Sequence, residues 1–263
     1  MELATELDLA LALADLSDAV TLPRFQRQDF TLGWKDDRTE VTEADREAEA
    51  TLAAQVQRAR PDHGFFGEEF GHQGDRDSPW QWIVDPIDGT SGFVRGIPVW
   101  GSLIALTYGG EVVIGVVSAP ALERRWSAAR GVGSFAGDRR CQVSGVTALA
   151  DAQVSVTLNA GWDALGLTGE LVKIQQEARR ARGFGDFWQH CLVAEGALDL
   201  AVDAVGVAPY DLAAVRVIVE EAGGTFTDRH GAATHEHDTA ISSNGHLHLP
   251  VLERLALASQ RES

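Results

Sequence analysis

The stretch QWIVDPIDGTSGF, residues 81–93, constrains the fold of this 263-residue chain most. Its apolar residues run into Asp85, and Asp88 follows after a proline and an isoleucine. A carboxylate at the end of a buried strand is very costly unless a cation meets it. The proline favours a turn, so both carboxylates can converge on one point, which suits a hard cation such as magnesium. Gly89 and Thr90 then begin a helix or a nest of backbone amides, which favours an anion such as phosphate.

An ordinary turn is the competing interpretation, because Asp, Pro and Gly are common turn residues. Two further acidic segments bear on the choice. GFFGEEF places Glu68 and Glu69 after an apolar run, and PYDLAAV places Asp211 at the very start of a helix. Taken singly, Glu68 is equally a solvated loop acid and Asp211 an N-cap.

The N-terminal third of the chain predicts two helices. Apolar residues over 3–19 form one helical face, which we expect to end before Pro23. A second helix is predicted from the N-cap Thr42 to about Arg60, with apolar residues every fourth position. Between them, the polar segment 33–45 predicts a loop.

From residue 82 onward the pattern favours strands. SLIALTY and EVVIGVVS, separated by Gly109 and Gly110, predict a hairpin. The second half then alternates strands and helices, predicted in this order: strand 154–158, helix 162–178, helix 187–197, strand 198–203, helix 211–222 and strand 225–228. The architecture predicted is layered, with an antiparallel sheet and two helices first and an α/β layer second.

Composition limits the partners of the chain. Lys and Arg number 22 against 39 Asp and Glu, a formal charge of −17, which disfavours nucleic acid and anionic membrane as partners. Each bound divalent cation would cancel two of these charges. Cys141 and Cys191 have no partner motif, so we predict a reducing, cytoplasmic location. The acidic N-terminus resembles neither a signal peptide nor a membrane span.

Four blocks in order along the chain resemble the inositol monophosphatase family, which are magnesium-dependent, lithium-sensitive phosphatases. They are VTEAD at 41–45, GEE at 67–69, DPIDGT at 85–90 and YDLAAVRVIVEEAGG at 210–224. The resemblance implies a five-layer αβαβα sandwich, usually as a homodimer. Residues 1–145 would then carry most metal ligands and residues 146–263 would contribute Asp211, within one continuous globular unit.

The resemblance also implies roles for individual residues. The implied ligands for two or three magnesium ions are Glu68, Asp85, Asp88, Asp211 and the carbonyl of Ile87. The implied phosphate-binding residues are Gly89, Thr90 and Ser91, and the implied water-orienting group is Thr90 with Glu68 and Asp45. Lys35 matches a lysine in a mobile loop. The chain departs from the family pattern at Gly92, Tyr210 and Glu40, where asparagine, tryptophan and proline are common.

Longer strings, including GTSGFVRGIPVWGSLIAL, resemble most the bacterial histidinol-phosphate phosphatases of this family. A small-molecule phosphate ester, histidinol phosphate, is therefore the predicted substrate, with Asp186 and Glu195 as predicted contacts to its cationic groups. A surface or capping acid is the alternative for both. Inositol phosphates, a sugar bisphosphate and 3′-phosphoadenosine nucleotides are alternative substrates, and a non-enzymatic acidic metal-binding protein is the alternative of another class.

Overall fold

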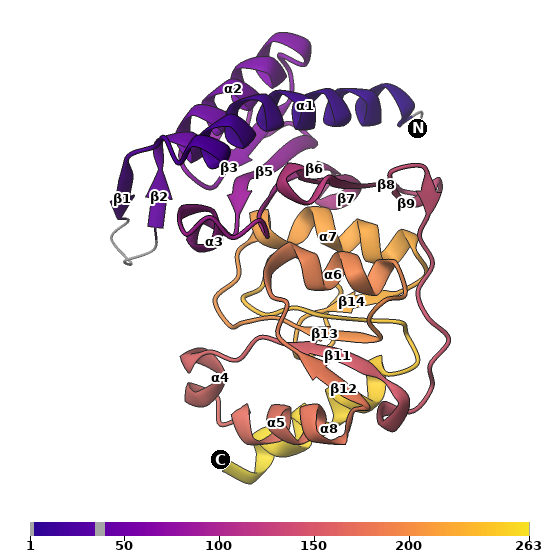
Figure 1. Ribbon diagram of the computed structural model, residues 1–263. Coiled ribbons are helices and arrows are strands. Elements are labelled where there is room, and N and C mark those ends of the chain that lie inside the picture. The colour runs from indigo at the N-terminus through magenta and orange to yellow at the C-terminus, as the bar shows by residue number, and fades with distance from the viewer. Residues whose placement is uncertain (1–2, 35–39, 263) are drawn as a thin grey trace.

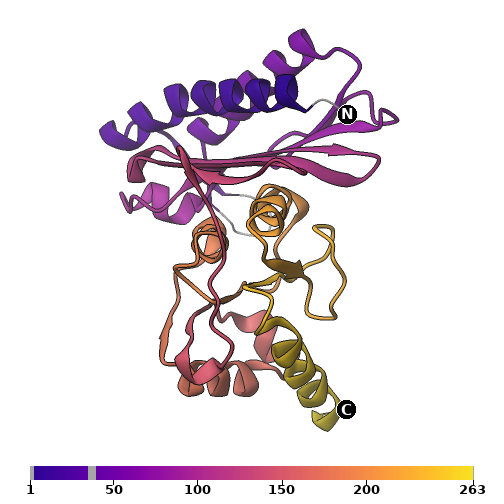
Figure 2. The same ribbon diagram turned by 90° about the vertical axis from the view of Figure 1, so that its right-hand side faces the viewer.

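Helices and sheets alternate in five layers in the computed structural model, which describes residues 3–34 and 40–262 (Figure 1). Seen after a 90° turn about the vertical axis, the large sheet separates one helical layer above it from a second helical layer below it (Figure 2). The small sheet and a last helical layer lie further below. The order is helices, sheet, helices, sheet, helices, which confirms the predicted αβαβα sandwich.

The outer helical layer consists of α1 (Ala4–Arg27) and α2 (Glu43–Ala59). α2 agrees with its prediction, and Thr42 caps it. The predicted end of the first helix was wrong, because α1 continues through Pro23. An interior proline costs a helix about 3 kcal/mol. Packing of the last turn opposes that cost, since the ring centroid of Phe25 lies 5.3 Å from that of Trp100.

The large sheet has eight strands. In spatial order they are β10 (Arg139–Arg140), β9 (Gly133–Ala136), β8 (Arg124–Ala129), β7 (Glu111–Ala119), β6 (Gly101–Tyr108), β5 (Trp80–Asp88), β3 (Gly64–Gly67) and β4 (Gly71–Gly74). Neighbours are antiparallel except β3 and β5, which are parallel. The hairpin of β6 and β7 confirms its prediction. Because β3 and β5 run the same way, with Gly67 opposite Val84, Glu68 and Asp85 follow these paired residues at the same end of the sheet.

A small antiparallel pair, β1 (Leu32–Trp34) and β2 (Glu40–Thr42), flanks the outer layer. The prediction of a loop over 33–45 was therefore wrong at both ends of this segment, where residues 33–34 belong to β1 and residues 40–45 to β2 and α2. Two short 3₁₀ turns, η1 (Pro120–Leu122) and η2 (Leu149–Asp151), and the single-turn helix α3 (Thr90–Val94) complete the connections of this half.

The middle layer consists of α6 (Asp186–Ala194) and α7 (Pro209–Glu221), between the two sheets. α7 lies tightly on the large sheet, because a Cβ at Gly115 of β7 would stand only 2.4 Å from the carbonyl oxygen of Ala214. The core cluster under it joins both halves of the chain, with Leu103 from β6 and Val215 from α7. The division of the chain at residue 145 stays a prediction.

The small sheet and the last helices form the far side. The strand order is β12 (Arg180–Arg182), β11 (Gln153–Val156), β13 (Leu200–Val202), β15 (Ile241–Ser243) and β14 (Thr225–Thr227). The covering helices are α4 (Ala160–Ala164), α5 (Thr168–Glu177) and α8 (His248–Glu262). The single helix predicted over 162–178 was wrong, because Gly166 adopts a φ of 69° and separates α4 from α5. Across the described ranges, no helix is long and apolar enough to span a membrane.

Candidate active site

Three carboxylates from two distant segments of the sequence meet where β5 ends and α7 begins. Asp85, Asp88 and Asp211 each offer an oxygen, and these oxygens all lie within 4.8 Å of one another. Asp85 is only 2% exposed and Asp88 9%. Glu68 leaves β3 beside them, because its amide donates to the carbonyl of Val84 on β5 at 3.2 Å.

The backbone between the two aspartates of β5 is irregular. The strand runs through Pro86 as far as Asp88, with a shift of register against β6 between Asp85 and Asp88. The predicted turn is therefore a bulge within the strand. The amide of Ile87 donates to Asp85 Oδ1 at 2.9 Å, and the carbonyl of Ile87 accepts the hydroxyl of Thr90 at 2.9 Å. These contacts orient the Asp85 side chain, the Ile87 carbonyl and the Thr90 hydroxyl toward one another.

Backbone amides from the middle layer fix the other two carboxylates. The amide of Phe187, in the first turn of α6, donates to Asp88 Oδ2 at 2.7 Å. The amide of Ala208 donates to Asp211 Oδ2 at 2.7 Å. Asp211 is the third residue of α7, so its prediction as the first residue of the helix was wrong by two positions. It caps the helix through Ala208 and also joins the cluster, so the two interpretations of its role are compatible.

Burial and the repulsion between carboxylates together determine the electrostatics of the cluster. Burial, and then the charge of Glu68, raise the pKa of Asp85 well above its ordinary value. Burial, followed by Asp186 and Asp211, raises the pKa of Asp88 in the same direction. Burial is also the largest cause that raises the pKa of Asp211 to about 7. A divalent cation would relieve this repulsion, and carboxylate oxygens are the ligands that magnesium prefers.

A cavity of about 620 Å³ opens beside the cluster. Asp211 belongs to both, so the cluster meets the cavity at this residue, whereas Asp85 and Asp88 are not among the lining residues. Gly92 and Tyr210, two of the three departures from the family pattern, line the cavity. A Cβ at Gly92 would stand 3.1 Å from the carbonyl oxygen of Val99, so the wall is tight around this glycine. The remaining lining residues are Trp34, Glu40, Glu68, Gly89, Thr90, Ser91, Arg95, Asp186, Gly206 and Ala208.

Thr90 connects the cavity to a buried acid. Its hydroxyl lies 3.2 Å from Asp45 Oδ1, and Asp45 has no exposed surface. The amide and hydroxyl of Thr42 both donate to Asp45 Oδ2, at 2.8 and 2.6 Å. Burial nevertheless raises the pKa of Asp45 to about 6. The threonine hydroxyl therefore lies between the cavity and a carboxylate that can exchange a proton near neutral pH.

The turn that carries the predicted phosphate-binding residues needs a glycine at its start. Gly89 has a φ of 85°, and a Cβ there would stand 3.1 Å from the carbonyl oxygen of Val99. Thr90 and Ser91 follow as the first residues of α3, whose first-turn amides have no acceptor within the helix. Arg95 donates to the hydroxyl oxygen of Ser91 at 2.7 Å.

The two predicted substrate contacts lie in different places. Asp186 lines the cavity as the first residue of α6, with a φ of 49°. The side chain of Asp186 faces the cavity. Desolvation by the surrounding protein, followed by the charge of Asp203, nevertheless raises the pKa of Asp186 to about 6. Glu195, after the C-terminus of α6, does not line the cavity. Lys35 lies outside the described residues.

Glu195 is instead surrounded by cations and an indole. It forms ion pairs with Arg124 and Arg139, and the indole nitrogen of Trp126 donates to it at 2.6 Å. The capping and structural alternative for Glu195 therefore fits these contacts better than substrate binding.

Sequence reasoning missed three residues around the site. Asp203 directly follows β13, and its Oδ2 accepts a hydrogen bond from His190 Nε2 at 2.9 Å. Its signal was the one that singled out Asp85, a carboxylate at the end of an apolar strand. Arg95 brings a cation to the lining. Glu49 holds the amides of Glu69 and Phe70 at 2.7 and 2.9 Å, and nothing in the pattern of its helix marks it.

The fold and the site define a layered α/β protein with a carboxylate-walled cavity. The family model of the inositol monophosphatase family matches residues 3–262. Histidinol-phosphatase of Mycobacterium tuberculosis is 47% identical over 95% of this chain and 97% of its own, and that of Streptomyces coelicolor is 42% identical over 92% and 94%. The extragenic suppressor protein suhB of Bartonella henselae superposes with a TM-score of 0.88 at 30% identity, over 95% of this chain and 98% of its own. The chain belongs to the inositol monophosphatase family, and it is a phosphatase that hydrolyses phosphoric monoesters.

Proposed function

We propose that the protein hydrolyses histidinol phosphate to histidinol and phosphate, with magnesium in the acidic cluster. The observation that carries this proposal is the convergence of Asp85, Asp88 and Asp211 within 4.8 Å at the wall of a cavity. The names of the relatives at 47% and 42% identity support the choice of ester.

The residues present fit a hard divalent cation. Glu68, Asp85, Asp88 and Asp211 would supply carboxylate oxygens, and the carbonyl of Ile87 a neutral one. The raised pKa values of the three aspartates show that their charges lack local compensation, which bound cations would provide. Two or three magnesium ions held there would neutralise phosphoryl oxygens, activate a water molecule and stabilise the leaving alkoxide.

The side chains of Thr90, Asp45 and Glu68 would orient the attacking water. The Thr90 hydroxyl can donate its one proton to Asp45 or to the carbonyl of Ile87, and its lone pairs remain open to the cavity. A water proton accepted there can pass to Asp45, whose pKa of about 6 leaves it mostly ionised at neutral pH. No covalent enzyme intermediate is required for this reaction.

The turn that begins α3 would hold the phosphate. The amides of Gly89, Thr90 and Ser91 lie at or before the first helical turn, where backbone donors are unpaired and favour an anion. Arg95 donates to the Ser91 hydroxyl oxygen, and hydrogen bonds from Arg95 and then from the Ser91 hydroxyl lower the pKa of Glu40, so these contacts hold the turn in place.

Asp186 is the residue that we assign to the cationic end of histidinol. It lines the cavity from the start of α6, where its Oδ2 would stand 3.5 Å from a Cβ at Gly89, and Asp203 lies close enough to raise its pKa. A bound ammonium or imidazolium group would favour the ionised form of both carboxyls. Glu195 has two arginine partners and is left out of this assignment.

Further properties follow from the family resemblance. We infer a homodimer, a cytoplasmic location and a small-molecule ester as the partner of the site, without nucleic acid or membrane. Both cysteines, Cys141 and Cys191, are free and buried, which is consistent with a reducing compartment.

A phosphate-release assay with magnesium tests the proposal. The panel contains histidinol phosphate, inositol 1-phosphate, fructose 1,6-bisphosphate and 3′-phosphoadenosine 5′-phosphate. We expect kcat/KM for histidinol phosphate to exceed the others by at least tenfold. A preference for another ester would overturn the substrate assignment, and Asp186→Asn should selectively raise KM for histidinol phosphate.

A further inference from the structure

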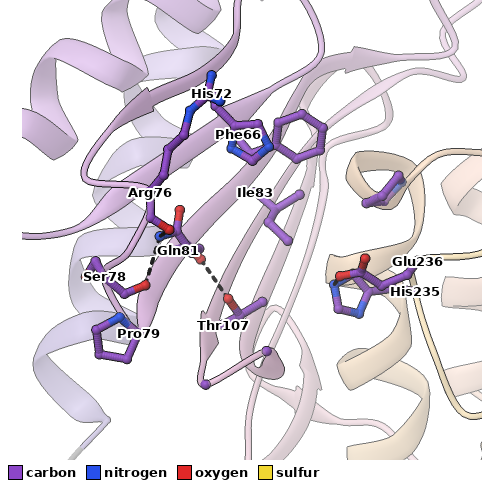
Figure 3. A pocket seen from close by; sticks show the side chains of 13 residues that line it. Phe66, His72, Arg76, Ser78, Pro79, Gln81, Ile83, Thr107, His235 and Glu236 are labelled. Atoms are coloured by element: carbon purple, nitrogen blue, oxygen red, sulfur yellow. Dashed lines mark hydrogen bonds and ion pairs between the residues drawn. The ribbon is translucent and has the colours of Figure 1, made fainter.

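A second cavity, of about 410 Å³, is lined by residues of β3, β4 and β5 and of the segment before β15 (Figure 3). Its floor is apolar and aromatic. Phe66 of β3 stacks on His72 of β4 with centroids 4.3 Å apart, and Ile83 of β5 lies opposite Phe66 in the parallel pair. Pro209, the first residue of α7, closes one side. Cavities of this size bury small organic ligands.

The wall contributed by the segment before β15 carries a buried donor. His235 is 2% exposed, and its Nε2 makes no hydrogen bond with the described residues, although Glu236 Oε1 lies 3.5 Å from it. Arg216 Nη1 lies 3.5 Å from His235 Nδ1, and because a guanidinium only donates, Nδ1 accepts and the proton of the neutral ring lies on Nε2. Burial lowers the pKa of His235, which keeps the ring neutral. A buried N–H without a partner is costly, so this wall favours a ligand with an acceptor.

The mouth of the cavity carries two opposite charges. Arg76, on the loop between β4 and β5, makes no side-chain hydrogen bond or ion pair with the residues that the structure describes. Glu236 is exposed, and its Oε1 lies 3.5 Å from Nε2 of the neutral His235 ring. Figure 3 shows these two residues on opposite sides of the floor. A carboxylate beside Arg76 and an ammonium beside Glu236 would complement both.

From these features we infer that the cavity binds an aromatic α-amino acid whose ring carries a hydrogen-bond acceptor. The ring covers Phe66 and Ile83 and accepts from His235. The α-carboxylate pairs with Arg76 and the α-ammonium with Glu236. Nothing in this assignment depends on the metal ligands or on the substrate of the phosphatase.

The position of the cavity also connects it to the phosphatase site. Three of its lining residues, Phe66, Ile83 and Pro209, each precede a proposed metal ligand by two positions in the chain. The ring centroid of Phe66 lies 6.0 Å from that of Tyr210, which lines the phosphatase cavity. A ligand that orders these three segments changes the affinity of the site for magnesium, and this part of the inference rests on the proposed function.

Calorimetric titration with four probes tests the binding. L-histidine has the ring acceptor, the carboxylate and the ammonium, whereas L-phenylalanine lacks the acceptor, histamine the carboxylate and imidazole-4-propionate the ammonium. We expect L-histidine to bind with one site per chain and each of the other three at least fivefold more weakly. Absence of L-histidine binding at 10 mM, or equal binding of all four, would overturn the proposal.

Variants and competition locate the site. Arg76→Gln and His235→Phe should each weaken L-histidine binding at least fivefold, while the matched change Arg58→Gln, on the exposed face of α2, should leave it unchanged. Far-UV circular dichroism and Tm identify any variant that fails to fold, in which case Glu236→Gln replaces it. Saturating histidinol should leave L-histidine binding intact. Displacement by histidinol, or insensitivity to all these variants, would place the amino acid elsewhere and overturn the proposal.

The connection to the metal site has its own measurement. The coupling factor must be the same in both directions, so the magnesium Kd with and without L-histidine should shift by the factor by which magnesium shifts the L-histidine Kd. We expect at least a threefold change. An unchanged magnesium Kd with L-histidine bound would overturn the proposed coupling but not the proposed amino-acid site. Failure of phosphate release from every ester would overturn only the proposed function.

Discussion

Two acidic regions of the molecule differ in what surrounds their carboxylates. Glu195 forms ion pairs with Arg124 and Arg139 and accepts the indole N–H of Trp126. At the cluster of Asp85, Asp88 and Asp211, the neighbouring charges that act on the pKa of Asp85 are all other carboxylates. Compensated acids such as Glu195 hold elements of the fold together, whereas an uncompensated cluster indicates where a cation from solution belongs.

Among the proposed variants, Asp88→Asn should cause the largest loss of activity, whereas changes to charge-compensated acids should have little effect on activity. It removes one charge from the cluster and little volume, and its amide oxygen can still accept from the amide of Phe187. We expect kcat/KM for the preferred ester to fall by about a thousandfold or more, with an unchanged circular dichroism spectrum. The control is Glu177→Gln, at an exposed acid paired with Arg254, which should retain activity within about twofold. Substantial turnover by Asp88→Asn would discard the site assignment.

Thr90 tests the proton path beside the cluster. Thr90→Ala removes the hydroxyl between the cavity and Asp45, and we expect kcat to fall by about a hundredfold or more, the usual range for loss of a positioned proton-transfer group. Thr90→Ser keeps the hydroxyl and should recover most of the rate. Steady-state kinetics of both variants gives the two kcat values. An equal loss of kcat in Thr90→Ser and Thr90→Ala would indicate that Thr90 acts through packing rather than through its hydroxyl.

Stability against pH should report the uncompensated charges directly. The folded-state pKa of Asp211 is raised to about 7, above its value of about 3.9 in an unfolded chain. Its contribution to stability is therefore fully present below about pH 4 and is lost as the pH rises through about 7. In the presence of a chelator, Tm should fall over this range, and millimolar magnesium should reduce the fall because it binds the folded state. Asp211→Asn should flatten the metal-free profile, and a profile identical to the wild type would contradict the assignment.

The compensated region should show the smallest effect on catalysis. Glu195→Gln removes the partner of Arg124 and Arg139, and we expect a loss of about 1–3 kcal/mol in the free energy of unfolding from chemical denaturation. KM for histidinol phosphate should not change. A selective rise of KM with unaltered stability would restore Glu195 as a substrate contact.

Local sequence patterns predicted much of the fold because its elements are locally consistent. The hairpin around Gly109 and Gly110 and the helix capped by Thr42 follow from turn and capping preferences alone. The end of α1 at Arg27 did not, because packing of Phe25 on Trp100 outweighs the local effect of Pro23.

In the candidate site, too, local sequence predicted some features, and others depend on tertiary packing. Asp85 and Asp88 were predicted to converge from their spacing, and their sequence neighbourhood also fixed the glycine turn after them. That Asp211 comes to the same place depends on α7 crossing the large sheet, which only the family resemblance implied. The partners of Glu195 lie 56 and 71 residues away in sequence, and no local pattern shows an ion pair of that kind.

The location of bound metal tests the central claim most directly. A crystal grown with manganese in place of magnesium, measured at the manganese absorption edge, gives the metal position by anomalous scattering. We predict an anomalous peak at bonding distance from carboxylate oxygens of Asp85, Asp88 and Asp211. A manganese peak at another part of the surface, with these three carboxylates free of metal, would contradict the account.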